Sequence, residues 1–275
     1  MEVLSPITSR AISGKQAFPF KYSICTLVTN PDEYQEMLQS FVRAGFDPSF
    51  CEFLHIDNSK SNTFEAYSGL NKFLQEAQGK YIILCHQDIL LNYDNLEVLE
   101  KRIEEIETMD PRWAIIGNAG AVGIKNKVYR ISEGDGVFRK CGHPPAKVVS
   151  VDENFILVKK EANLALSGDL SGFHLYGTDL CIIASILGYN AYVVNFHLLH
   201  KSKGNADKSF FDIKKNLIKK YSRAFAPRFI ETTMTKMVIS SSSFLTKLLN
   251  TGFMLFWVRQ YFKLKFRKDL KRKIE

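Results

Sequence analysis

The chain has 275 residues, of which 45% are hydrophobic, 24% charged and 12% aromatic, and its formal net charge is +8. This profile is that of an ordinary globular protein, and it excludes a wholly disordered, collagen-like or coiled-coil chain. Residues 205–275 carry 17 Lys and Arg against 5 Asp and Glu, whereas the first 204 residues carry 20 against 24. A mildly acidic body is thus followed by a strongly basic tail, which predicts contact with an anionic surface, either a membrane or nucleic acid.

The cysteines and the apolar segments indicate where the chain resides. The five cysteines are scattered and lack CxxC spacing: Cys25, Cys51, Cys85, Cys141 and Cys181. We expect buried free thiols and therefore a reducing compartment. Residues 1–10 lack the pattern of a signal peptide, and the apolar stretch at residues 253–258 is too short to span a bilayer. These features predict a cytoplasmic protein that is soluble or attached to a membrane surface.

Hydrophobic periodicity divides the first half of the chain into short apolar strands and amphipathic helices. The predicted elements are a strand at residues 22–29, a helix at 32–44, a strand at 50–56, a helix at 63–77, a strand at 81–85, a helix at 96–109 and a strand at 113–117. Such alternation predicts a parallel sheet wound with helices.

The second half is less regular. Residues 120–149 are rich in Gly, Lys and Pro, which predicts hairpins and loops. A strand is expected at residues 151–158, a short helix at 180–187 and a strand at 191–194. From residue 207 onward the pattern is helical, aromatic and basic.

Polar residues follow three of the predicted strands at the point where each strand ends. They are Thr29-Asn30, Asp57-Asn58-Ser59 and His86-Gln87-Asp88. In sheets of this kind ligands bind beyond the carboxyl ends of the strands, so we expect these residues to face one crevice.

Two of these polar positions and two later ones are candidates for chemistry. Asp88 and His86 offer the carboxylate and imidazole that bind divalent cations, although a polar strand end that only caps a turn is the simpler alternative. Asp179 precedes an apolar helix and is either an N-terminal cap or a general base. His200 follows a late strand and could complete the metal site of Asp88, with His197 as the competing candidate.

The order of these motifs carries a resemblance. The segments are Gly79-Lys-Tyr-Ile-Ile-Leu-Cys-His-Gln-Asp88, Phe173-His-Leu-Tyr-Gly-Thr-Asp179-Leu-Cys, Leu187-Gly-Tyr189 and His200, preceded by the two earlier polar strand ends. Together they resemble nucleotide-sugar glycosyltransferases of the GT-A fold. More narrowly, they look like the bacterial branch related to family two, with His-Gln-Asp in place of Asp-x-Asp. The resemblance covers roughly residues 21–203.

The resemblance implies a fold and a division of the chain. It implies a GT-A fold, a Rossmann-like mixed α/β sheet flanked by helices, over residues 21–204. Residues 1–20 are then a lead segment. Residues 205–275 are a basic, aromatic-rich helical extension that attaches to the membrane surface.

The resemblance also implies residue roles. The donor would be held by Thr29, Asn30, Asp57, His86, Gln87 and Asp152, the last of which contacts the sugar or the acceptor. Asp88 and His200 would bind Mn²⁺ or Mg²⁺ on the diphosphate, and Asp179 would be the catalytic base. Whether His86 or His197 also touches the metal stays open.

The implied chemistry is physically coherent. A metal neutralises the leaving nucleotide diphosphate, and an aspartate opposite it deprotonates the acceptor hydroxyl for in-line attack. One displacement inverts the anomeric centre, so a second nucleophilic carboxylate is not required. The sequence therefore predicts an inverting hexosyl- or N-acetylhexosaminyltransferase.

The tail suggests where this enzyme would act. Residues 253–274 mix Phe, Trp, Leu and Tyr with eight Lys and Arg, which is typical of an interfacial membrane helix. A solvated basic helix that packs its aromatic side chains on the catalytic domain is the alternative. We expect a UDP-sugar donor, a lipid-linked glycan acceptor of bacterial surface polysaccharide (O-antigen or capsule) and no nucleic acid.

Two other functions remain as alternatives. One is a non-catalytic module of the same fold that binds a sugar nucleotide or a glycan. The other is a nucleic-acid-binding protein that uses the basic tail, although no nucleic-acid-binding motif is recognisable. The sugar, the nucleotide base, the acceptor linkage and the oligomeric state are not fixed by these residues.

Overall fold

The computed structural model describes residues 9, 11, 14, 17–202 and 207–271, with side chains described up to residue 265. The chain forms two compact units, Met1–Ile213 and Lys214–Glu275, which are described separately below. The predicted boundary between residues 204 and 205 lies outside the described residues, as does most of the predicted lead segment at residues 1–20.

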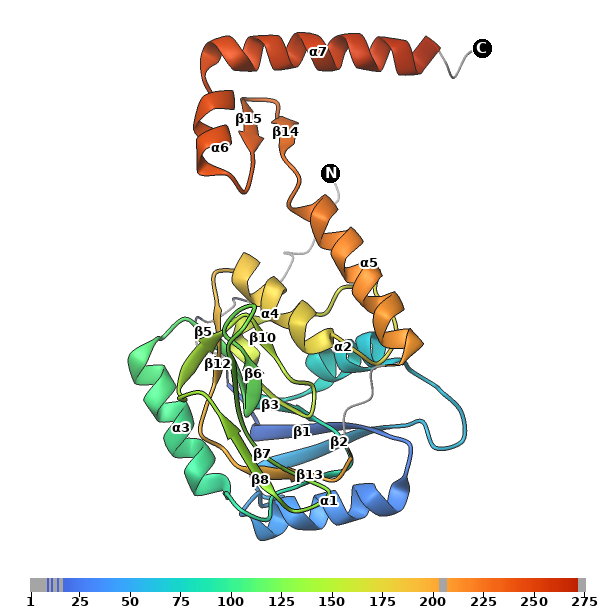
Figure 1. Ribbon diagram of the computed structural model, residues 1–275, viewed down its shortest axis with the longest axis vertical. Helices are drawn as coiled ribbons and strands as arrows, with labels where there is room; N and C mark the ends of the chain where they lie inside the picture. The colour runs from blue at the N-terminus through green and yellow to red at the C-terminus, as the bar shows by residue number, and fades with distance from the viewer. Residues whose placement is uncertain (1–8, 10, 12–13, 15–16, 203–206, 272–275) are drawn as a thin grey trace, which may run out of the picture. The chain divides into compact units, whose positions relative to one another are not determined.

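The first unit is built on a seven-stranded mixed sheet (Figure 1). In spatial order its strands are β2 (Cys51–Asp57), β1 (Phe20–Val28), β3 (Gly79–Cys85), β11 (Phe155–Lys159), β5 (Trp113–Gly117), β12 (Asn190–Val193) and β9 (Ala146–Val148). β11 runs antiparallel to β3 and β5, and β9 runs antiparallel to β12, whereas the other neighbours pair in parallel. β1 is mainly apolar and is buried over most of its length, since both of its faces are covered.

A second sheet carries the segments that complete the site. Its strands, in spatial order, are β10 (Ser150–Val151), β6 (Ala119–Ala121), β7 (Lys127–Glu133), β13 (Leu198–His200) and β4 (Ile89–Leu90), with β8 (Phe138–Cys141) paired to β7. β13 pairs antiparallel with β4, and His200 lies opposite Ile89. This pairing places His200 beside the residues that follow β3.

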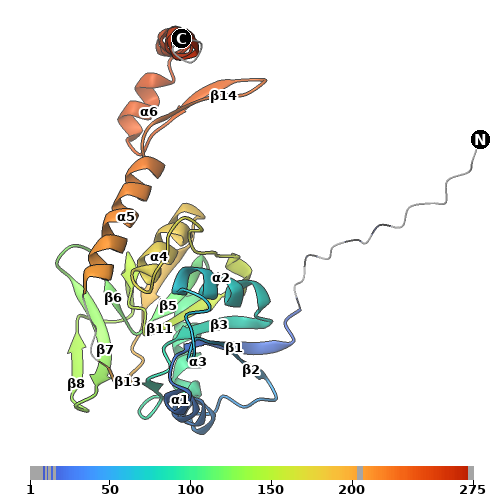
Figure 2. The same cartoon turned by 90° about the vertical axis from the view of Figure 1, so that its right-hand side faces the viewer.

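Helices cover both faces of the large sheet (Figures 1 and 2). The helices of this unit are α1 (Pro31–Arg43), α2 (Ala66–Glu76), α3 (Leu96–Met109) and α4 (Tyr176–Ile186), with a 3₁₀ turn at Lys160–Ala162; α5 (Lys208–Ala224) spans the boundary between the units. α1 begins at Pro31, and the Asn30 side chain caps it by accepting the N–H groups of Asp32 and Glu33.

One apolar core joins α1 and α3 to the sheet. Met37 and Phe41 of α1 and Leu99 of α3 pack in one cluster with alternate residues of the strands, among them Ile24 and Ile83. The intervening residues of β3, Ile82 and Leu84, are also buried and point to the opposite face, which α2 and α4 cover. The structure therefore confirms the predicted fold class, a mixed sheet flanked by helices.

The second unit contains a hairpin and two helices. The hairpin consists of β14 (Arg228–Glu231) and β15 (Lys236–Ile239), and α6 (Ser243–Leu249) and α7 (Gly252–Lys271) follow. The Asn250 side chain ties the end of α6 to β15, accepting the N–H of Val238 and donating to its carbonyl. In the described part of the chain, none of the helices has both the length and the apolar character that crossing a bilayer requires.

Two predicted elements differ from the structure, and two short strands were not predicted. The helical pattern expected after residue 207 is wrong at residues 228–239, where the β-branched residues form the β14–β15 hairpin. The predicted strand at residues 151–158 is two strands, β10 and β11, in different sheets. β4 and β13 were not predicted, because strands of two or three residues show no periodicity.

Candidate metal and donor site

The carboxyl ends of β2, β1 and β3 meet at one edge of the large sheet. Val28 pairs with Asp57, and Cys25 pairs with Leu84, so the residues that follow each strand emerge side by side. The predicted crevice residues Thr29, Asp57 and His86 therefore share this edge.

Two histidines and an aspartate converge beside β3. His86 Nδ1 lies 3.4 Å from His200 Nε2, and His200 Nε2 lies 3.4 Å from Asp88 Oδ1. One ligand atom from each of the three residues lies within 4.8 Å of the others. Asp88 and His200 are buried, and His86 is half-buried. The structure thus brings together the two predicted metal ligands and adds His86 to them.

The surroundings favour an ionised carboxylate at Asp88 beside a neutral imidazole at His86. Burial opposes ionisation of Asp88, but the hydrogen bonds from His200 and Ser202 and the nearby imidazoles outweigh it and hold the pKa of this carboxyl well below its usual range. Burial, reinforced by His200, lowers the pKa of His86. An ionised carboxylate beside an unprotonated imidazole is the state that binds a cation.

The outer partners of the cluster orient its ligand atoms, and His200 Nε2 also lies 3.1 Å from the Ser202 hydroxyl. The backbone N–H of Ser202 donates to Asp88 Oδ2 (3.1 Å), so Oδ1 is the oxygen that faces His200. The Tyr176 hydroxyl lies 2.9 Å from His86 Nε2 and donates its proton to the carbonyl of Glu153 (3.2 Å). Because this hydroxyl has only one proton, it accepts a hydrogen bond from His86 Nε2–H, which leaves the lone pair on Nδ1.

The packing of α4 against β10 fixes Tyr176. A Cβ atom at Gly177 would lie 2.5 Å from the carbonyl oxygen of Val151, so only glycine allows the first turn of α4 to approach so closely. The Gly177 N–H also donates to the Glu153 carboxylate (3.3 Å). Burial, with the charge of Asp152, raises the pKa of Glu153 to about 8.

The cluster fits a divalent cation. A metal about 2.1 Å from each of its ligands holds neighbouring ligand atoms about 3.0–3.4 Å apart, which matches both 3.4 Å separations. Two imidazoles and one carboxylate suit transition metals such as Mn²⁺ or Zn²⁺ better than an all-oxygen site does.

Gln87 links two strand ends instead of pointing into solution. Its Oε1 accepts the N–H groups of Thr29 (2.7 Å) and Asn30 (2.9 Å), and its Nε2 donates to Thr29 Oγ1 and to Glu33. Asn30 is occupied as the cap of α1. Both residues lie at the predicted place, but their amides are engaged within the protein.

Asp57 and Asp152 are exposed carboxylates of the same region. Asp57 accepts the N–H of Ser59, which lowers its pKa. Asp152 follows β10 and accepts from the backbone and side chain of Asn154. Its charge opposes, without reversing, the lowering of the His86 pKa that burial and His200 cause. Both side chains are exposed to solvent.

Asp179 has a different environment from the one predicted. It is 0% exposed, and its two oxygens accept the backbone N–H (2.8 Å) and the hydroxyl (2.7 Å) of Ser167. A general base must reach a substrate hydroxyl. The position of Asp179 instead suits a structural anchor between α4 and the loop at Ser167.

His197 lies apart from the cluster. Its ring stacks on Tyr93, with centroids 3.9 Å apart, and its Nε2 lies 2.9 Å from Ser132 Oγ. Sequence reasoning did not identify Tyr176, Ser202 or Glu153 as parts of the site. Tyr176 stands in the quoted motif around Asp179, which was the only available signal.

Fold and site together define a mixed α/β protein with a His-Asp-His metal-binding geometry at the carboxyl edge of its sheet. No family model matches the sequence. The chain is 33% identical over 234 residues to a protein of Fuscovulum blasticum described as "ATP synthase subunits region ORF 6", covering 83% of this chain and 94% of that protein. The chain belongs to the same family as that protein.

Solved structures with a similar chain path include a mannosyltransferase and TarS. A mannosyltransferase from Pyrobaculum calidifontis, in complex with GDP-Man and Mn²⁺, aligns with a TM-score of 0.49 and 11% identity over 76% of this chain and 68% of its own. Residues 1–349 of TarS from S. aureus align with a TM-score of 0.47 and 12% identity, covering 66% and 60%. The function proposed below rests on the residues of this chain.

Proposed function

We propose that this chain is a metal-dependent inverting glycosyltransferase that transfers a hexosyl or N-acetylhexosaminyl unit from a UDP-sugar. The observation that carries the proposal is the convergence of His86, Asp88 and His200 at the carboxyl edge of the sheet. A divalent cation at these residues would neutralise the charge that develops on a departing nucleotide diphosphate.

The donor would lie along the edge formed by the first three strands. Thr29 and Asp57 are exposed there, beside the cluster, and are the residues proposed to meet the nucleoside. Gln87 would act indirectly, because its amide holds the ends of β1 and β3 in register.

The acceptor hydroxyl needs a base, and we assign this role to Asp152 in place of Asp179. Asp152 is exposed and electrostatically coupled to His86, whereas both oxygens of Asp179 are bound inside the protein. Asp152 would take the hydroxyl proton as the acceptor oxygen attacks the anomeric carbon from the side opposite the diphosphate. A single displacement of this kind inverts the anomeric configuration.

The second unit supports attachment to a membrane surface. Its exposed aromatic residues include Phe244, Phe253, Phe256, Trp257, Tyr261 and Phe262, and Met234 in the turn between β14 and β15 is 93% exposed. Arg259, Lys263 and Lys265 of α7 are exposed among them. Aromatic and basic side chains together bind the interface of an anionic bilayer, which would suit a lipid-linked glycan acceptor of surface-polysaccharide synthesis.

Donor turnover tests the enzymatic part. The full-length chain is incubated with Mn²⁺ and a panel of UDP- and GDP-sugars, with release of nucleotide diphosphate as the readout. We expect one nucleotide class to be turned over, and chelation by EDTA to stop it. Mn²⁺ affinity, measured by calorimetry, should fall more than about 100-fold in Asp88→Asn, because even outer-shell partners contribute 10–100-fold. Glu104→Gln, an exposed acid of α3, is the matched control. Full activity without metal would overturn the proposal.

Vesicle binding tests the attachment. The chain should sediment with phosphatidylglycerol vesicles and not with phosphatidylcholine vesicles, and deletion of residues 253–275 should abolish this. The near-ultraviolet circular dichroism of Trp113 and its neighbours reports that the first unit stays folded. Sedimentation of the truncated chain would contradict the assignment of the tail as the anchor.

A further inference from the structure

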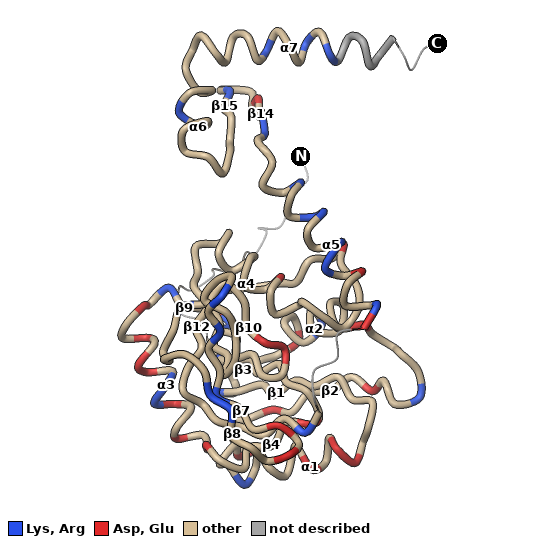
Figure 3. Tube along the Cα trace, in the orientation of Figure 1, with Lys and Arg blue, Asp and Glu red and all other residues tan. Residues whose placement is uncertain are grey.

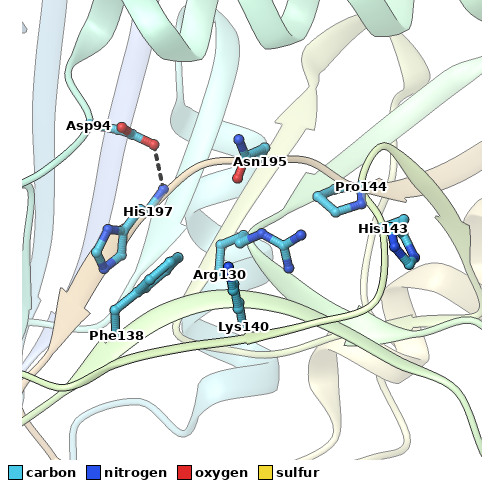
Figure 4. Close-up of a pocket in the computed structure, with 8 residues that line it drawn as sticks. All are labelled: Asp94, Arg130, Phe138, Lys140, His143, Pro144, Asn195 and His197. Carbon is cyan, nitrogen blue, oxygen red and sulfur yellow. Dashed lines mark hydrogen bonds between the residues drawn. The ribbon is translucent and has the colours of Figure 1, made fainter.

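A pocket lies apart from the metal-binding cluster. It has a volume of about 470 Å³, and none of the three cluster residues lines it. Figure 4 shows the side chains that line it: Asp94, Arg130, Phe138, Lys140, His143, Pro144, Asn195 and His197. They come from β7, β8, the loop after β8, the segment that leads into β13 and, for Asp94, the segment between β4 and α3. Nothing in the proposed transfer reaction uses this pocket.

The strand register places two cations next to each other in it. Arg130 of β7 lies directly opposite Lys140 of β8 in the antiparallel pair. Directly opposed residues project to the same face with their Cβ atoms about 4.5–5.5 Å apart, and like charges in this arrangement destabilise a sheet. Figure 3 shows Lys and Arg along these two strands. An anion between the two side chains would relieve the repulsion.

Arg130 is held in a fixed position. Its guanidinium donates to the carbonyls of Tyr129 (2.7 Å), Cys141 (2.8 Å) and Gly142 (3.0 Å), so the half-buried charge is positioned before any ligand arrives. Among the residues that the structure describes, no carboxylate forms an ion pair with Arg130 or Lys140. Asp94 also lines the pocket, but its Oδ2 accepts the backbone N–H of His197 (2.6 Å; Figure 4). The charge of the pocket is therefore positive.

One wall of the pocket is aromatic. The Phe138 ring lies 4.1 Å from the His197 ring, centroid to centroid, and His197 stacks in turn on Tyr93. Phe138 is 45% exposed, so part of its ring is available to a ligand. Asn195 and His143 add exposed groups that can hydrogen-bond hydroxyls. A rigid apolar ring, a few hydrogen-bonding groups and a fixed charge together recognise a small polar ring that carries an anion.

We propose that this pocket binds an acidic saccharide, a sugar that carries a carboxylate or a phosphate. The anionic group would sit between Arg130 and Lys140, and the sugar ring would lie against Phe138. The site is separate from the metal-binding cluster and does not depend on the transfer reaction.

Ligand titration by NMR on the full-length, metal-free chain tests the proposal. The probes are glucuronate, glucose 6-phosphate, glucose, inorganic phosphate and uridine monophosphate. We expect both acidic sugars to bind at least about tenfold more tightly than glucose, because hydrogen bonds to charged groups are worth more than a factor of ten. Equal binding of glucose would overturn the role of the cations. Equal binding of inorganic phosphate would overturn the role of the sugar ring, as would tighter binding of uridine monophosphate.

Substitutions locate the binding and separate it from the proposed transferase. Lys140→Ala should weaken glucuronate binding at least about tenfold, and Lys140→Arg should restore it. Lys72→Ala, which removes an exposed lysine of α2, is the matched control and should bind normally. Asp88→Asn should leave glucuronate binding unchanged although it weakens Mn²⁺ binding. Unchanged binding in Lys140→Ala would overturn this pocket as the site, whatever the outcome of the donor assay.

Discussion

Asp88 and Asp179 are both buried carboxylates of the first unit, but their surroundings differ. Asp88 is 8% exposed and presents one oxygen to two imidazoles, while a backbone N–H holds the other. Asp179 is 0% exposed, and one serine binds both of its oxygens. Burial alone therefore does not distinguish a reactive carboxylate from a structural one. The distinction lies in the carboxylate oxygen that the backbone does not hold. In Asp88 this oxygen faces the imidazole of His200, whereas in Asp179 it accepts the hydroxyl of Ser167.

The largest expected effect concerns the exposed carboxylate beside the Asp88 region. Asp152→Asn should lower turnover by about 10²–10⁴, because an amide cannot accept the acceptor proton. Mn²⁺ affinity and the melting temperature should stay close to those of the unmodified chain. A loss of the same size in Asp57→Asn, with Asp152→Asn active, would move the base to the other exposed aspartate.

Metal binding at Asp88 should also respond to substitution of Tyr176, a residue that contacts His86 without itself being a ligand. Tyr176→Phe removes the hydroxyl that orients His86 and should weaken Mn²⁺ binding about 10–100-fold in calorimetry. Tyr192→Phe is the matched control, since its hydroxyl binds Asp110 away from the cluster. Equal Mn²⁺ affinity in both variants would mean that packing alone orients His86.

The Asp179 region should show a loss of stability with no change in metal binding. Asp179→Asn replaces a charged oxygen that accepts from Ser167 by an N–H₂ group, so one of the two hydrogen bonds from Ser167 to a carboxylate is lost. The free energy of unfolding should fall by about 1–3 kcal/mol in urea titration. If Asp179→Asn were fully stable and inactive instead, the catalytic role expected from the sequence would return.

Glu153, beside Tyr176, should give an effect on stability that depends on pH. Its pKa is about 8 in the folded chain, above the unfolded value of about 4.3, so between these values the folded state holds a proton that the unfolded state has lost. Stability from this group is complete below pH ~4.3 and is lost as the pH rises through about 8, with a slope of at most about 1.4 kcal/mol per pH unit. Glu153→Gln should remove this slope in urea titrations across the window. An identical slope in the variant would contradict the raised pKa.

Local patterns were sufficient to predict the strand ends that form the site. β1 and β3 are apolar runs that stop at polar residues, so the positions of Thr29 and Asp88 followed from hydrophobicity and the geometry of parallel sheets. The role of Asp179 could not be predicted in the same way. Its distinguishing partner, Ser167, lies 12 residues earlier in a loop, and only tertiary packing brings the two together.

The place of His86 in the metal-binding cluster and the hairpin in the tail could also not be predicted from local sequence patterns. His86 depends on Tyr176, which is 90 residues away, for the orientation of its ring. β14 and β15 are four residues each, and aromatic and basic residues occur in them as they do in the helices around them. Elements this short are set by pairing partners and not by their own periodicity.

The short pairing of β13 with β4 has a consequence for the order in which the molecule is made. Asp88 and His200 are separated by 112 positions, so a ribosome must translate past Ser202 before the three ligand atoms can meet. Domains begin to fold from the N-terminus during translation, when β1 to β3 are already available. The nascent chain can therefore form much of its core while its metal-binding site is still incomplete. Loading of the ion is then a late step in maturation, after most of the first unit has been synthesised.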